Sequence, residues 1–196
     1  MELWGTIIGA LITAVATVTS VWLGHIYVKR KRQNPVAEDT AQSANVYTAI
    51  KFTLEEMKAD RAYVLQFHNG GQYYSGRGQQ KYSCTHEIAA DGISHECDHS
   101  QNHRVSNHHS YIRTLIEEER YCPLDTALIN DNAFSHNLRL QGVKSLYNVP
   151  IKTLNGKIIG ILGVDYVKKS ARQKDFNKDT FLFMKKQARI IAGYLV

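Results

Sequence analysis

The first part of the chain is an unbroken apolar segment. Leu3 to Gly24 contains no charged side chain, and the basic cluster KRKR follows at residues 29–32. A helix over the uncharged run is roughly 33 Å long, enough to cross a hydrocarbon core of about 30 Å. Trp4 and Trp22 lie near its ends, where indole rings favour the membrane interface. The pattern predicts a transmembrane anchor over residues 1–28 and a basic juxtamembrane linker over residues 29–36.

The charges around this segment predict its orientation. A cleaved signal peptide carries positive charge before its apolar stretch, but here the basic cluster follows it. The positive-inside rule places such a cluster in the cytoplasm. We therefore expect a single-pass protein of the inner or plasma membrane, with its N-terminus outside and its C-terminal domain cytoplasmic. A buried core helix is the weaker alternative, because apolar runs of this length are rare in soluble folds of this size.

The charged residues and cysteines of the chain limit which partners and which fold classes we expect. The formal net charge is +6, and the juxtamembrane cluster supplies most of it. Attraction to anionic lipid headgroups explains that cluster, so the expected partner is the lipid bilayer and not a nucleic acid. The second basic stretch, Lys168 to Lys174, is typical of a solvated turn. Three cysteines are too few, and odd in number, for a disulfide scaffold.

The remaining residues, 37–196, have the size of one domain with its own core. A helix is predicted over residues 37–58, with Tyr47, Ile50, Leu54 and Met57 forming one apolar stripe. That stripe fits either packing on its own domain or a short coiled coil between subunits.

Alternation and turn signals predict the other elements. The expected strands cover residues 61–68, 81–88, 124–129, 145–152 and 157–167, and the expected helices cover residues 111–119, 133–140 and 176–196. Residues 73–78 and 94–109 are expected to be loops, the second rich in histidine. Asn155-Gly156 supplies the left-handed geometry of a tight hairpin turn between the last two strands.

The last third of the chain carries a family resemblance. The segments GVKS at 142–145, LYNVPI at 146–151 and NGKIIGIL at 155–162, with Ile129-Asn-Asp131 before them, resemble the GAF-domain family. The resemblance implies an α/β (α+β) fold, in which an antiparallel sheet has helices on both faces and a pocket on one of them. The segments FHNGG at 67–71, YSG at 74–76 and KYSCTHE at 81–87 resemble, more narrowly, small membrane-anchored GAF-like proteins of tailed phages.

The family resemblance implies a module that binds a small ligand or a protein partner for sensing or regulation, without catalysis. The alternative is a viral or structural membrane protein whose domain serves as a protein-docking surface. One GAF branch reduces free methionine sulfoxide with cysteines, and Cys84 lies on the matching strand. However, the other two cysteines do not match that branch, so we expect no enzymatic activity.

Polar side chains near strand ends are candidates for ligand contacts. Alternation places Tyr82, Cys84 and His86 on one face of a strand, opposite Ser83, Thr85 and Glu87. His68 lies beside two glycines and either contacts the ligand or hydrogen-bonds a local turn. The candidate ligand-binding residues are His68, Asn69, Tyr82, Glu87, Tyr147 and Asp165.

Cysteine and histidine residues gather between positions 84 and 109. Thiolate and imidazole suit zinc, so the candidate metal ligands are Cys84, His86, His95, Cys97 and His99. The paired ligands are separated by a single residue, whereas common zinc signatures use two to four. A solvated polar loop or a pH-responsive role therefore remains open beside the zinc hypothesis.

Small residues also predict self-association of the membrane helix. Gly5, Gly9, Thr13 and Thr17 recur on one helix face, and Gly5-x-x-x-Gly9 has the spacing of a helix-dimerisation motif. A homodimer is therefore a candidate assembly.

Overall fold

The computed structural model describes residues 2–31 and 34–196 and divides the chain into two compact units, residues 1–41 and 42–196. The expected linker of residues 29–36 includes residues 32 and 33, which lie outside the described residues. The first unit contains helix α1 (Glu2–Lys31), and its segment Ile7–Val28 is long and apolar enough to span a membrane. Hydropathy alone predicted this helix.

Helix α2 (Pro35–Met57) begins where the sequence predicts a break. The Asn34 side chain accepts a hydrogen bond from the Ala37 backbone N–H at 3.1 Å, and Pro35 occupies the first helical position. An asparagine cap followed by proline is a favoured helix start, because the cap satisfies a free N–H and proline has none to lose.

The second unit is built on a five-stranded antiparallel sheet with the order β3-β2-β1-β5-β4. The strands are β1 (Arg61–Gln72), β2 (Gly78–Ala89), β3 (His103–Arg104), β4 (Ser145–Lys152) and β5 (Ile158–Tyr166). The helices are α3 (His109–Glu118), α4 (Asn132–Leu140) and α5 (Lys178–Leu195), with short 3-10 helices at Val105–His108, Thr126–Leu128 and Gln173–Asp175. The predicted α/β (α+β) sheet with helices on both faces is confirmed.

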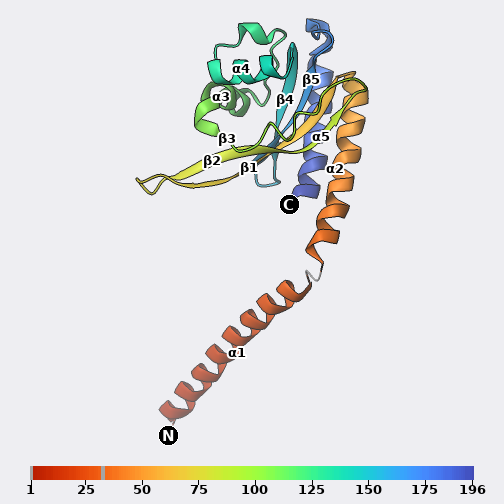
Figure 1. Cartoon of the computed structure of the whole chain (residues 1–196). Helices are drawn as coiled ribbons and strands as arrows, with labels where there is room; N and C mark the ends of the chain where they lie inside the picture. The colour runs from red at the N-terminus through yellow and green to blue at the C-terminus, as the bar shows by residue number, and fades with distance from the viewer. Residues whose placement is uncertain (1, 32–33) are drawn as a thin grey trace. The chain divides into compact units, whose positions relative to one another are not determined.

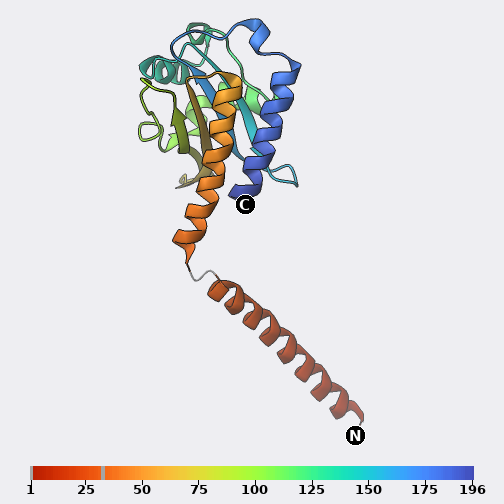
Figure 2. The same ribbon diagram turned by 90° about the vertical axis from the view of Figure 1, so that its right-hand side faces the viewer.

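Two hydrophobic cores lie on opposite faces of the sheet. Helices α2 and α5 cover one face, and α3 and α4 cover the other (Figure 1). Figure 2 shows α2 and α5 side by side, and Phe52 of α2 meets Phe183 of α5 edge to face with ring centroids 5.8 Å apart. Ile50 is fully buried against the sheet, and Leu54 and Met57 pack on the same core. These three residues of the predicted stripe therefore pack on their own domain, and the fourth, Tyr47, is 41% exposed and meets the His86 ring of β2 edge to face.

Two regions between the strands differ from the sequence prediction. Residues 124–129 do not form a strand, because Asp125 accepts a hydrogen bond from the Ala127 backbone N–H and caps a short 3-10 helix instead. Within the expected loop 94–109, His103 and Arg104 pair with β2 and complete the sheet. A two-residue strand has no alternation pattern to reveal it.

Gly163 makes room for two side chains of the adjacent strands. It lies opposite Tyr63 on β1 and Asn148 on β4. A Cβ atom at this position would come within 2.3 Å of the Tyr63 ring and 2.4 Å of the Asn148 side-chain oxygen. The glycine therefore allows both side chains to lie across the central strand.

We expect Gly163→Ala to lower the free energy of unfolding by about 1–3 kcal/mol, because the methyl group forces a buried ring out of its position. Gly193→Ala is the matched control, since Gly193 is exposed on α5 and a methyl group there would have nothing within 4 Å. Urea unfolding of the detergent-solubilised full chain measures both variants. Equal stability of the two variants would contradict this account of Gly163.

Candidate functional site

A small cavity lies between the sheet and helices α3 and α4. Its volume is about 50 Å³, which is enough for a few water molecules. Its lining is unusually rich in acids and aromatic rings. The acids are Glu87, Glu96 and Asp165; the rings are Tyr63, Tyr82, His103, Tyr111 and Phe134; and the other lining residues are Leu65, Cys84, Ser100, Asn137, Leu138, Gln141 and Asn148.

An outer pocket of about 390 Å³ adjoins this cavity. It shares Glu96, His103, Asn137 and Gln141 with the inner cavity, and His99 and Leu140 complete its lining. The Gln141 side-chain amide donates to the Ser100 hydroxyl at 3.0 Å. This hydrogen bond ties the end of α4 to the loop that precedes β3, beside the shared residues.

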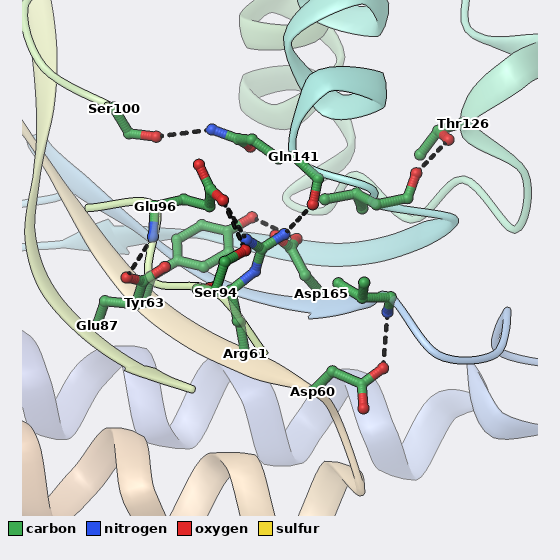
Figure 3. A network of polar contacts seen from close by, with 12 residues as sticks. Asp60, Arg61, Tyr63, Glu87, Ser94, Glu96, Ser100, Thr126, Gln141 and Asp165 are labelled. Atoms are coloured by element: carbon green, nitrogen blue, oxygen red, sulfur yellow. Dashed lines mark hydrogen bonds and ion pairs between the residues drawn. The ribbon is translucent and has the colours of Figure 1, made fainter. Parts of the chain in front are cut away.

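A buried arginine organises the polar side of the site (Figure 3). The Arg61 side chain is 1% exposed and its two terminal nitrogens lie 3.6 Å from Glu96 and 3.4 Å from Asp165. The same nitrogens donate to the backbone carbonyls of Ser94, at 3.4 Å, and Gln141, at 2.9 Å. One guanidinium thus connects β1, β5, the loop before β3 and the end of α4.

Burial changes the protonation of Asp165. The pKa of this carboxyl is raised to about 7, chiefly by desolvation; Glu87 and Glu96 act in the same direction, while Arg61 and the Tyr63 hydroxyl oppose the shift. The Tyr63 hydroxyl lies 3.0 Å from both Asp165 and the Asn148 side-chain oxygen. A tyrosine has one proton to donate, so the Tyr63 hydroxyl donates to one of these two oxygens at a time.

The third acid is held by backbone groups. The Glu87 carboxylate accepts hydrogen bonds from the backbone N–H groups of Glu96, at 2.8 Å, and Cys97, at 3.0 Å. The exposed His95 imidazole lies 3.4 Å from the same oxygen. These contacts fix the loop over the mouth of the site to strand β2.

Tyr82, which lines the cavity, is paired with a buried histidine outside the lining. The Tyr82 hydroxyl hydrogen-bonds the Nδ1 atom of the buried His108. Desolvation lowers the pKa of His108 to about 4, with a further contribution from His103. The imidazole is therefore neutral near pH 7, and it can accept the proton of the Tyr82 hydroxyl.

The structure brings together three of the six candidate ligand-binding residues, namely Tyr82, Glu87 and Asp165. His68 instead hydrogen-bonds the Ser83 side chain at 2.9 Å, and Asn69 accepts from the Gly71 backbone N–H. Tyr147 is fully buried in the opposite core, where its ring meets Phe176 edge to face. None of these last three lines the cavity.

A β-bulge in β2 makes the facing of its side chains differ from the simple alternation expected from the sequence. Val64 pairs with His86, but its neighbour Leu65 pairs with Cys84, so one extra residue sits on β2 between them. An extra residue reverses which side chains share a face. As a result, Cys84 joins Tyr82 and Glu87 in the cavity lining, whereas His86 faces α2 and contacts Ser43 and Tyr47. The sequence prediction that His86 shares a face with Cys84 is wrong.

The bulge also bears on the zinc hypothesis. Cys84 and His86 lie on opposite faces, and the His95 and His99 side chains are exposed beside Glu87 and Glu96. Within residues 2–31 and 34–196, no three cysteine, histidine or acidic side chains converge as metal ligands. The zinc site predicted from Cys84, His86, His95, Cys97 and His99 receives no support.

Sequence reasoning missed several residues of the site, above all Arg61, Tyr63, Glu96 and Asn148. For Arg61, however, the sequence does contain a signal. Arg61 opens an otherwise apolar strand and Asp165 interrupts the run IIGILGVDY, and charged residues in buried strands need partners. Glu96 offered no such signal, because it lies in a polar loop.

Comparison with solved structures places this architecture among known domains. The GAF domain region of a Geobacter sulfurreducens PCA protein matches with a TM-score of 0.59 and 14% identity, over 83% of this chain and 98% of that one. The PixJ GAF domain of Thermosynechococcus elongatus, in its blue-light absorbing form, matches with a TM-score of 0.59 and 13% identity, over 81% and 89%. The domain has a GAF-like fold.

A third neighbour is GAF3 from Slr1393 of Synechocystis sp. PCC6803, in its photoproduct state, with a TM-score of 0.59, 13% identity and coverage of 77% and 90%. The sequence matches no protein-family model and no curated protein. At these identities, the likeness describes the fold of the GAF-like domain and not its ligand.

The raised pKa of Asp165 gives a pH-dependent stability. A carboxyl whose pKa is higher in the folded state favours folding when protonated, so this contribution to the free energy of unfolding is present below about pH 4. It is lost as the pH rises to about 7, by about 1.4 kcal/mol for each pH unit. We expect Asp165→Asn to abolish this decrease in the free energy of unfolding with rising pH, as measured by urea unfolding between pH 4 and pH 8.

Asp91→Asn is the control, because Asp91 is an exposed acid in a loop of the same domain. It should keep the wild-type pH dependence. The same pH dependence in Asp165→Asn as in wild type would show that Asp165 does not titrate in this range.

Proposed function

We propose that this chain is a membrane-anchored sensing module whose GAF-like domain binds a small ligand in the cavity beside α3 and α4, without catalysis. The observation that carries the proposal is a buried polar cavity that adjoins a larger outer pocket. Ligand sites are concave and combine apolar walls with a few converging polar groups. This lining has both features, because it combines three acids with aromatic rings.

Two observations support the absence of catalysis. Burial raises the pKa of the Cys84 thiol, and burial also raises the pKa of the Cys97 thiol. A protonated thiol is a poor nucleophile, so the pair is badly suited to the cysteine-based reduction known from one GAF branch. The neutral His108 is already engaged by Tyr82.

The proposal includes a location. Helix α1 would anchor the chain in the inner or plasma membrane, and the basic cluster at residues 29–32 would hold the GAF-like domain in the cytoplasm. The homodimer through the membrane helix remains a prediction. It is supported by the spacing of Gly5-x-x-x-Gly9, which places two small residues on one face of the helix.

A second candidate function is protein docking, as in a viral or structural membrane protein of the kind found in tailed phages. The inner cavity favours this alternative in one respect, because about 50 Å³ is far below the volume of most ligand sites. The rings of Tyr111 and Phe134, which line this cavity, stack on each other with centroids 4.0 Å apart.

Topology can be tested by protease protection. Protease added to intact cells should leave residues 37–196 uncut, while the same protease added to inside-out membrane vesicles should digest them. The physical reason is the cost of moving the basic cluster across the membrane. Digestion of the domain in intact cells would overturn the proposed cytoplasmic location.

Ligand binding can be tested by native mass spectrometry of the detergent-solubilised full chain. We expect a bound small molecule that Asn137→Trp removes, because Asn137 lines both the cavity and the outer pocket and an indole there would block the passage. His136→Trp is the matched control, since His136 is the exposed neighbour on α4. A chain without any adduct would favour docking, and an adduct that survives Asn137→Trp would place the ligand elsewhere.

A further inference from the structure

The cavity has an imbalance of charge. Its wall contains three carboxylates, and no lysine or arginine of the described chain lines it. Arg61 is not part of this lining but pairs with Glu96 and Asp165, so one guanidinium faces three acids. The imidazoles of His95 and His99 contact the acids from outside, where they are 70% and 78% exposed, and they add charge only when protonated.

An excess of buried negative charge over positive charge is costly. The protein can relieve it by protonating Asp165 or by binding a cation in the cavity. The backbone N–H groups that hold Glu87 stabilise the ionised form of that carboxylate and do not neutralise it. The lining therefore favours a positively charged ligand over a neutral or negative one.

The aromatic walls provide an independent indication of the same ligand chemistry. Rings of Tyr63, Tyr82, Tyr111 and Phe134 surround the cavity. The Tyr63 and Tyr82 hydroxyls are already bonded to Asp165 and His108, so these residues offer the cavity mainly their ring surfaces. Ring faces attract cations, and organic ammonium groups are commonly bound in aromatic cages.

The spacing of the acids argues for an organic cation and against a metal ion. Metal ions need several ligands within about 2.0–2.6 Å of one point, and the described residues offer no such group of three. An alkylammonium group spreads its contacts over a larger volume. A single ammonium head group fits a cavity of about 50 Å³. The outer pocket, which His99 and Leu140 help to line, would hold the rest of the molecule.

We propose that the cavity binds the ammonium head group of a small organic amine, with Glu96 and Asp165 as counter-ions and the tyrosine rings as walls. This inference rests on the proposed ligand-binding function and specifies the class of ligand. Glu96 lies nearest the solvent of the two counter-ions, since its side chain is 17% exposed against 5% for Asp165. It is shared with the outer pocket and would meet the amine first.

Three small probes of similar size test the charge preference, namely ethylammonium chloride, ethanol and sodium acetate at constant ionic strength. Saturation-transfer NMR on the detergent-solubilised full chain measures their binding. We expect saturable binding of ethylammonium alone. Glu96→Gln should weaken it roughly tenfold or more, because it removes a charge-assisted contact while keeping the shape of the side chain.

Two further variants test whether weaker ethylammonium binding is specific to the cavity or follows from the loss of any acidic side chain. Glu117→Gln is the matched control, because it removes an exposed acid on α3 far from the lining, and it should bind ethylammonium like wild type. Asn137→Trp should abolish binding by blocking the passage. Circular dichroism of each variant confirms that it remains folded, and Glu96 is chosen over Asp165 because it is the less buried acid.

The outcomes distinguish this inference from the proposed function. Absence of saturable ethylammonium binding overturns the inference, and so does equal weakening by Glu96→Gln and Glu117→Gln. Ethanol or acetate binding that is lost in Asn137→Trp would also overturn it, while leaving a ligand-binding cavity in place. The proposed function itself fails only if native mass spectrometry finds no ligand that depends on the cavity.

Discussion

The ion pair between Arg61 and Asp165 is the interaction on which the site depends. The two residues lie opposite each other on the adjacent strands β1 and β5, and both side chains are almost fully buried. Burying two charges is favourable only when their remaining hydrogen-bonding groups also find partners. The carbonyls of Ser94 and Gln141 accept from the two terminal nitrogens of Arg61, which draws the loop before β3 and the end of α4 onto the sheet. The buried Nε atom of Arg61 has no hydrogen-bond partner among the described residues.

The two faces of the sheet consequently differ in character. The face under α2 and α5 is closed by a large apolar core, in which residues such as Ile50, Leu162 and Met184 are fully buried. The opposite face combines a smaller core with the polar network and the cavity. The cavity therefore lies on the second face, beside the buried Asp165.

Gly163 and the β-bulge in β2 are the two local features that shape the cavity. The absence of a side chain at Gly163 allows Tyr63 and Asn148 to approach each other across β5, where they are hydrogen-bonded at 3.0 Å. The bulge turns Glu87 toward the cavity and His86 away from it. Gly163 lacks one side chain, and the bulge adds one residue to β2. Together these two small changes decide which side chains meet at the cavity.

The sequence alone determined the features that depend on local patterns. Hydropathy over residues 3–24 predicted α1, and the segment from Ser145 to Tyr166 predicted the hairpin, because two short strand-like runs joined by an Asn-Gly turn are a short-range signal. The GAF resemblance rested on the same segment. Tyr82, Glu87 and Asp165 could be proposed as site residues because polar groups near strand ends in an apolar domain are conspicuous.

Only the tertiary structure decided which of those residues share a site. The bulge separated Cys84 from His86, and Asp125 replaced an expected strand with a 3-10 turn. Arg61 and Glu96, far apart along the chain, became neighbours through the pairing of strands and the fold of a loop. Register shifts and loop paths are set by the packing of the whole domain, and a one-residue shift reverses every side chain beyond it, so no local pattern in the sequence can specify them.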